Sequence, residues 1–172
     1  MSLVVLIGGA RSGKSSLALR LAGRAAAPVV FVATGEARDD EMAKRIELHR
    51  QERPPEWETV EEPVELERAL TAISDGSTVV VDCLSLWVSN LIEVEPAARI
   101  EEAAAAASRI AASRRGLTIA VTNEVGLGIV PMHPLARSYR DVLGRVNTTW
   151  VDAADEAHLV VAGRTLELER LP

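Results

Sequence analysis

Eight residues near the start of the chain have the types and the spacing of a phosphate-binding loop. Gly8 and Gly13 bracket four residues, and Lys14 and Ser15 follow directly. Glycine permits the backbone angles that turn several N–H groups toward one anion, and the N-terminus of a following helix adds its dipole. Lys14 can then reach the β- and γ-phosphates of a nucleotide, and the Ser15 hydroxyl can bind Mg²⁺. A nucleotide site is therefore predicted at Gly8-Gly9-Ala10-Arg11-Ser12-Gly13-Lys14-Ser15.

The segments on either side match the context that such a loop requires. An apolar run at residues 3–7 predicts a buried strand before the loop, and an Ala- and Leu-rich run at 16–22 predicts a helix after it. A strand, a glycine-rich loop, Lys-Ser and a helix, in this order, favour phosphate binding over a plain glycine-rich turn.

An acidic residue closes another apolar run further along the chain. Asp82 follows three valines, and an acid after a buried strand is typical of the residue that orients Mg²⁺ or its water beside such a loop. Acids also end strands without any functional role, so the pattern gains its meaning from the loop. We expect Ser15 and Asp82 to be the metal-binding side chains.

His49 has the chemistry of a nucleophile. Met42, Ile46 and His49 are spaced i, i+4 and i+7 in a predicted helix, so they share one face. Spacing alone leaves two interpretations open, a solvated helical histidine beside arginines and a partly covered side chain with a catalytic role. A neutral imidazole is a good nucleophile toward phosphorus, so a reaction at this side chain should weaken in acid.

The rest of the chain alternates predicted strands with predicted helices. Strands are expected at residues 29–33, 78–82, 117–122, 157–162 and 165–169, with a short extended piece at 57–60. Helices are expected at 39–53, 63–73, 84–92, 96–115 and 133–154. This alternation predicts a single α/β domain over residues 1–172, with a mainly parallel sheet and helices on both faces. The carboxyl ends of the strands should surround one site, and they carry Gly8, Thr34, Asp82 and Thr122.

Composition and charge argue against several classes of protein. The 172 residues are 48% hydrophobic but only 3% aromatic, so the core must be aliphatic, and the single cysteine, Cys83, is expected to be buried. A net charge of −6 argues against a nucleic-acid partner. No apolar run approaches the length of a membrane span, and no signal-peptide pattern precedes the first strand, so a cytoplasmic location is expected.

Several further stretches accompany the phosphate-binding loop. They are Asp39-Asp40-Glu41-Met42-Ala43 with Arg45-Ile46 and His49, Asp82-Cys83-Leu84 with Asn90-Leu91, Thr122-Asn123-Glu124-Val125-Gly126-Leu127-Gly128-Ile129-Val130-Pro131, and Gly144-Arg145-Val146-Asn147. Together they resemble the bifunctional adenosylcobinamide kinase / adenosylcobinamide-phosphate guanylyltransferase family, CobU. The match runs almost from end to end, and the stretch at 122–131 is highly specific beside that loop.

The resemblance implies a three-layer P-loop NTPase fold similar to RecA, and a homotrimer. It implies that ATP or GTP phosphorylates the hydroxyl of adenosylcobinamide in the presence of Mg²⁺. GMP would then pass from GTP to adenosylcobinamide phosphate through a GMP-histidine intermediate, which gives adenosylcobinamide-GDP and pyrophosphate. His49 matches the position of that histidine, and Lys14 is the other catalytic side chain expected.

By the same resemblance, the nucleotide site extends beyond the phosphate-binding loop. Its further residues would be Thr34, Gly35, Glu36, Gln51, Glu52, Arg53, Pro54, Glu61 and Asp82. Gln51 and Glu52 differ from the residues seen in relatives, so we expect these two positions to contribute their backbone.

The residues alone leave two other functions open. One is a P-loop kinase of a different small alcohol, in which His49 is only structural. The other is a non-catalytic module gated by a nucleotide. The Asn-Lys-x-Asp sequence that GTPase switches use to recognise guanine is absent from this sequence, which disfavours the switch form of that module.

Overall fold

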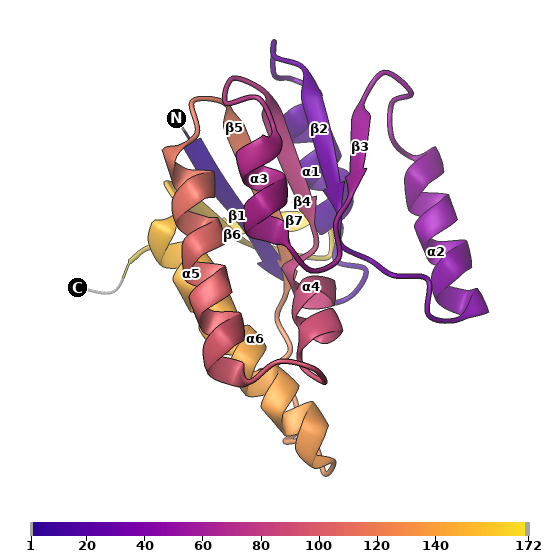
Figure 1. Cartoon of the computed structure of the whole chain (residues 1–172), viewed down its shortest axis with the longest axis vertical. Coiled ribbons are helices and arrows are strands. Elements are labelled where there is room, and N and C mark those ends of the chain that lie inside the picture. Colours follow the sequence, from indigo (N-terminus) through magenta and orange to yellow (C-terminus); the bar gives the residue numbers. More distant parts are fainter. Residues whose placement is uncertain (1, 171–172) are drawn as a thin grey trace.

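The computed structural model describes residues 2–170, and these form a seven-stranded sheet flanked by helices (Figure 1). The strands are β1 (Ser2–Gly8), β2 (Val29–Ala33), β3 (Glu58–Glu61), β4 (Thr78–Asp82), β5 (Leu117–Asn123), β6 (Glu156–Val161) and β7 (Arg164–Glu167). The helices are α1 (Lys14–Ala22), α2 (Asp40–Gln51), α3 (Leu66–Ala72), α4 (Leu84–Leu91), α5 (Ala97–Ser113) and α6 (Pro134–Ala153).

The strand order is β3-β2-β4-β5-β1-β6-β7, and every neighbouring pair is parallel except β6 with β7. The central strands are continuous apolar runs because both of their faces are covered. In β4, for example, Val79, Val80 and Val81 are fully buried. The predicted α/β fold, with a mainly parallel sheet and helices on both faces, is therefore confirmed, and so is an exposed edge strand near the C-terminus.

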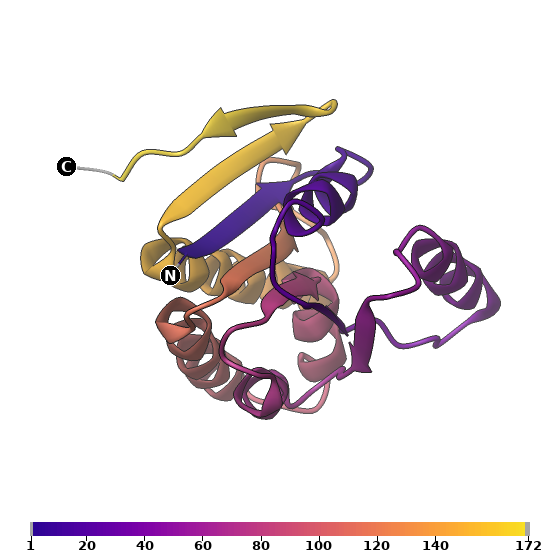
Figure 2. The ribbon, with the colours of Figure 1, turned by 90° about the horizontal axis from the view of Figure 1, so that it is seen from above.

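Side chains of β1 alternate between two cores, one on each face of the sheet. Leu3 and Val5 pack with helices α3, α4, α5 and α6, whereas Val4 and Leu6 pack with α1. Figure 2 shows that more helices cover one face of the sheet than the other, and it shows α2 standing apart beyond the β3 edge. No residue of α2 is buried. Among the helices, α2 is therefore the one that the core holds least.

Helix ends differ from the predictions by up to about three residues, and two of these differences have a clear cause. A helix was expected from Pro63, but α3 begins at Leu66. The Glu62 carboxylate accepts hydrogen bonds from the N–H groups of Val64 and Glu65, at 3.2 and 2.9 Å, so this segment forms a turn before the helix starts. The other helix was expected to reach Arg115, but α5 ends at Ser113 because the chain extends at Arg114.

The buried Arg114 side chain closes the end of the sheet opposite the carboxyl ends of the strands. Its guanidinium donates to the carbonyls of Leu70, Ile73, Ser74 and Ser77 at 2.6–3.2 Å. Replacing Arg114 with methionine should lower the free energy of unfolding by about 3 kcal/mol, because four carbonyls lose a charged donor. Urea denaturation measures this. Arg115→Met, which removes an exposed ion pair with Asp75, should cost less than about 1 kcal/mol. Equal losses in the two variants would contradict a stabilising role for the buried contacts of Arg114.

Candidate active site

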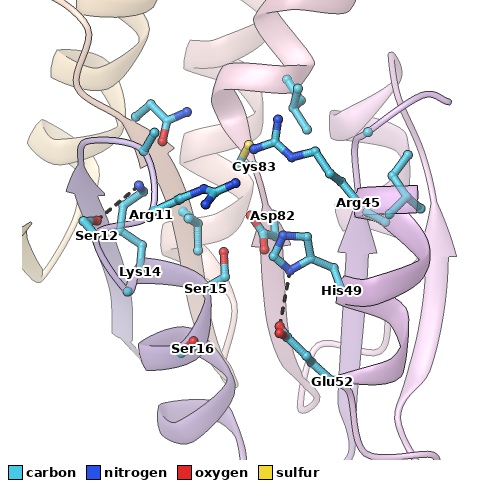
Figure 3. A pocket seen from close by; sticks show the side chains of 18 of the residues that line it. Arg11, Ser12, Lys14, Ser15, Ser16, Arg45, His49, Glu52, Asp82 and Cys83 are labelled. Carbon is cyan, nitrogen blue, oxygen red and sulfur yellow. Dashed lines mark hydrogen bonds and ion pairs between the residues drawn. The ribbon is translucent and has the colours of Figure 1, made fainter. Parts of the chain in front are cut away.

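A cavity of about 420 Å³ opens at the carboxyl ends of the central strands. One wall is the loop between β1 and α1, the floor is the end of β4, and the opposite wall is α2. Figure 3 shows Arg11 and Lys14 on the loop side, Arg45, His49 and Glu52 on the α2 side, and Asp82 between them. The strand ends thus surround one site, as the topology predicts.

The loop wall is held in shape by two glycines and by a distant hairpin. Gly13 has a φ of +100°, a conformation that other residues rarely adopt. A Cβ on Gly8 would lie 2.2 Å from the carbonyl oxygen of Val160 in β6. The turn between β6 and β7 supports the loop directly, because the N–H of Gly163 donates to the Ser12 carbonyl at 2.8 Å. The anion-binding shape therefore depends on the C-terminal hairpin as well as on the local sequence.

The Lys14 ammonium lies against the loop. It donates to the Gly9 carbonyl at 2.7 Å and to the Ser12 hydroxyl at 3.4 Å. Burial lowers the pKa of Lys14 below its ordinary value, and Cys83 and Asp82 oppose that shift when they carry negative charges. A polyanion in the cavity would act in the same direction as those charges and favour the charged ammonium.

The Asp82 carboxylate is partly buried at the floor of the cavity. Burial raises the pKa of Asp82, and the Ser15 hydroxyl and the positive charges of His49, Arg53 and Lys14 oppose the rise. The carboxylate and the hydroxyl are hard oxygen ligands placed side by side, which suits Mg²⁺. Among residues 2–170 there is no cluster of three or more His, Cys, Asp or Glu side chains that could hold a metal alone.

The opposite wall, α2, is anchored from its C-terminal half. Arg50 pairs with Glu61 of β3 at 3.1 Å. Just after the helix, the Arg53 guanidinium lies 3.7 Å from the centre of the Phe31 ring. These contacts turn the face that carries Met42, Ile46 and His49 toward the phosphate-binding loop. The His49 side chain is half exposed, and its Nδ1 lies 3.4 Å from Glu52 Oε2.

The cavity brings together most of the residues predicted for the nucleotide site. Those that line it are Ala10, Arg11, Ser12, Gly13, Lys14, Ser15, Gly35, His49, Glu52, Arg53 and Asp82. Its basic side chains outnumber the two carboxylates of Glu52 and Asp82. This balance suits an anionic ligand such as a nucleoside triphosphate.

The other predicted residues lie around the cavity without lining it. They are Gly8, Gly9, Thr34, Glu36, Gln51, Pro54 and Glu61. Thr34 is fully buried, and its hydroxyl donates to the Cys83 carbonyl and accepts from the Cys83 N–H. Glu36 pairs with Arg38, and Gln51 donates to Glu47. In this structure the side chains of Thr34, Glu36 and Gln51 thus bond to neighbouring residues of the chain.

Comparison with known proteins matches this chain to an enzyme family. Residues 4–168 match the family model CobU, described as cobinamide kinase / cobinamide phosphate guanyltransferase. The chain belongs to this family. It is 42% identical over 175 residues to the bifunctional adenosylcobalamin biosynthesis protein CobU of Escherichia coli K12, covering 94% of this chain and 96% of that protein. It is 38% identical over 169 residues to the bifunctional adenosylcobalamin biosynthesis protein CobP of Pseudomonas aeruginosa, covering 98% of each.

A solved structure from Pyrococcus horikoshii OT3 has a similar fold. Its TM-score with this chain is 0.57, it is 8% identical, and the similarity covers 96% of this chain and 85% of that chain. At this identity the likeness shows the fold alone. Within residues 2–170 no helix combines the length and the apolar character needed to cross a membrane.

Sequence reasoning about this member of the CobU family missed the buried amides that hold the strand ends. Asn90 of α4 donates to the Thr34 carbonyl at 2.8 Å and to the Pro63 carbonyl at 3.0 Å. Asn147 of α6 accepts from the Thr122 hydroxyl at 2.7 Å and donates to the Asn123 carbonyl at 3.0 Å. Both asparagines belong to stretches that resemble the family, and that was the available signal.

The prediction that Cys83 is buried is confirmed. Burial and the charge of Asp82 raise the pKa of the Cys83 thiol to about 11. The thiol therefore stays protonated near neutral pH.

Proposed function

We propose that this chain phosphorylates adenosylcobinamide with ATP or GTP and then transfers GMP from GTP to adenosylcobinamide phosphate. The transfer passes through GMP bound to His49 and gives adenosylcobinamide-GDP and pyrophosphate. Family membership supports the two activities. The observation that carries the proposed intermediate is that His49 and the phosphate-binding loop form facing walls of one cavity.

The two walls suit two different displacements. In phosphoryl transfer, the loop and Lys14 hold the triphosphate and stabilise charge while the substrate hydroxyl attacks the γ-phosphorus. In guanylyl transfer, His49 attacks the α-phosphorus, and pyrophosphate leaves with the electrons of the broken P–O bond. Lys14 and the loop N–H groups stabilise the leaving group. A phosphate oxygen of adenosylcobinamide phosphate then attacks the same phosphorus and releases the imidazole.

We propose Mg²⁺ as the metal for both steps, held by Ser15 and Asp82. The neighbouring hydroxyl and carboxylate support this assignment. The ion would supply positive charge beside the phosphates. The protein contribution is to orient two oxygen ligands at the cavity floor.

A two-stage assay tests the proposed function. The purified chain with adenosylcobinamide, Mg²⁺ and ATP or GTP should give adenosylcobinamide phosphate, and GTP should then convert that product to adenosylcobinamide-GDP, both identified by mass spectrometry. EDTA should abolish both conversions. Phosphorylation without any GDP product would reduce the function to a kinase, and tight nucleotide binding without either product would leave a binding module.

The proposal includes a homotrimer of single-domain chains in the cytoplasm. Supporting a subunit contact, the loop after β5 carries Leu127, Ile129 and Met132 with exposed fractions of 87, 97 and 96%, and such exposed apolar groups are common at interfaces. Light scattering on the native protein should give three times the mass of one chain. A monomer mass would exclude this part of the proposal.

A further inference from the structure

Glu52, which lines the cavity on the α2 side, contacts the proposed nucleophile. Glu52 follows the final turn of α2, three residues after His49. Its Oε2 lies 3.4 Å from His49 Nδ1, and both side chains line the cavity. Such contacts are often long in ligand-free sites and shorten when substrate binds.

The contact orients the imidazole ring. With Nδ1 toward Glu52, the other ring nitrogen, Nε2, lies on the opposite side of the ring, toward Asp82 (Figure 3). An ionised carboxylate only accepts hydrogen bonds, so a neutral ring that donates to Glu52 carries its proton on Nδ1. The lone pair then belongs to Nε2, the nitrogen that faces the cavity.

Other charged groups near His49 do not supply this orientation. Asp82 faces the ring from the floor of the cavity (Figure 3), but among the described residues the carboxylate within ion-pair distance of His49 is that of Glu52 and not that of Asp82. Arg11 and Lys14 on the facing loop, and Arg45 and Arg53 on the α2 side, are cations, and a cation cannot accept a proton from Nδ1. Within the part of the chain that the structure describes, Glu52 is the acidic residue within ion-pair distance of the His49 ring.

We propose that Glu52 is a positioning residue that holds the Nδ1–H tautomer of His49 and makes Nε2 the nitrogen that receives GMP. This inference rests on the proposed function for its catalytic part. It also differs from the backbone contribution expected of Glu52 from the sequence. In the first displacement, the Nε2 lone pair forms the N–P bond while the bridging P–O bond breaks and its electrons leave on pyrophosphate.

Glu52 also has a role after that bond forms. The ring is then cationic and keeps its proton on Nδ1, beside the Glu52 carboxylate. The second displacement forms a P–O bond to the acceptor phosphate, breaks the N–P bond and returns its electrons to Nε2. No proton moves between the ring and any other group, so the same contact serves both half-reactions.

Two measurements on the full chain test the role of Glu52. Long-range ¹H–¹⁵N NMR, with His49 assigned by its loss in His49→Ala, should show the neutral ring mainly as the Nδ1–H tautomer. Glu52→Ala should shift the tautomer toward Nε2–H, and Glu52→Gln, which keeps an acceptor oxygen, should preserve it. GMP-histidine formation should slow about tenfold or more in Glu52→Ala, the scale seen when an imidazole loses its orienting partner. Phosphorus NMR should place GMP on Nε2 of the wild-type ring.

A matched control separates this contact from a general charge effect. Glu47 lies on α2 two residues before His49, is exposed, binds Gln51 and does not line the cavity. Glu47→Ala should leave the tautomer and the rate unchanged. An Nε2–H tautomer in the wild type, GMP on Nδ1, or a Glu52→Ala variant equal to wild type in both measurements would overturn the proposal. A tautomer that depends on Glu52 in a chain that GTP does not label would support the contact and contradict the proposed function instead.

Discussion

Replacing Lys14 with alanine should weaken the binding of both GTP and ATP by at least about 100-fold. Losing a charge-assisted contact to phosphate in a partly buried site costs roughly 3 kcal/mol or more. The ammonium is already held over the loop by the Gly9 carbonyl at 2.7 Å, so it is positioned for phosphates that the loop would hold. Isothermal titration calorimetry gives the affinities directly.

A matched variant controls for the change in net charge. Lys44 is an exposed residue of α2 that does not line the cavity. Lys44→Ala should therefore bind nucleotide as the wild type does. A Lys14→Ala variant with an unchanged affinity for GTP would show that the loop does not hold the phosphates.

Replacing His49 with alanine should abolish guanylyl transfer while the kinase reaction continues. The loss should reach at least about 1,000-fold, because removing a nucleophile eliminates the covalent route rather than weakening a contact. In the proposed mechanism, phosphorylation depends on the loop and Lys14, which lie across the cavity from α2, and on Asp82 at the floor of the cavity. Chromatography of the corrinoid products measures the two conversions separately.

His158 offers the matching control for this variant. It lies on β6, pairs with Glu156 at 3.2 Å and is not among the residues that line the cavity. His158→Ala should keep both activities. A His49→Ala variant that makes adenosylcobinamide-GDP at a rate near that of wild type would require a direct attack of the acceptor on GTP.

Local patterns predicted the part of the site that is local in sequence. The phosphate-binding loop is contiguous, and its strand and helix follow from an apolar run and an Ala- and Leu-rich run on either side. Asp82 could be placed because the carboxyl ends of parallel strands meet at one edge of a sheet. The spacing of Met42, Ile46 and His49 likewise predicted a shared helical face, which lines the cavity.

The rest of the site depends on contacts between residues far apart in the sequence, which local patterns do not predict. The position of α2 depends on the contact of Arg50 with Glu61 and of Arg53 with Phe31, and no spacing along the chain indicates either pair. Thr34 sits at a predicted strand end, yet its side chain is fully buried against Cys83. Burial of this kind follows from how the elements pack, so the expectation that Thr34 lines the site could not be refined from the sequence.

The proposed role of Glu52 likewise could not be predicted from the sequence. A glutamate three residues after a helical histidine is usually a solvated charge pair worth little. The proposed role of this pair depends on the orientation of α2, which turns His49 toward the phosphate-binding loop. The side of the ring away from Glu52 then faces the cavity. That orientation comes from the tertiary structure.

The most direct measurement is to incubate the chain with GTP labelled at the α-phosphate and Mg²⁺, and to map the label by peptide mass spectrometry. We predict a covalent label that is lost in acid and stable in base, lies on the peptide that contains His49, and is absent in His49→Ala. The isolated labelled protein should then pass its GMP to adenosylcobinamide phosphate. No covalent label on the wild-type chain, or a label on another residue, would contradict the assignment of His49 as the GMP carrier.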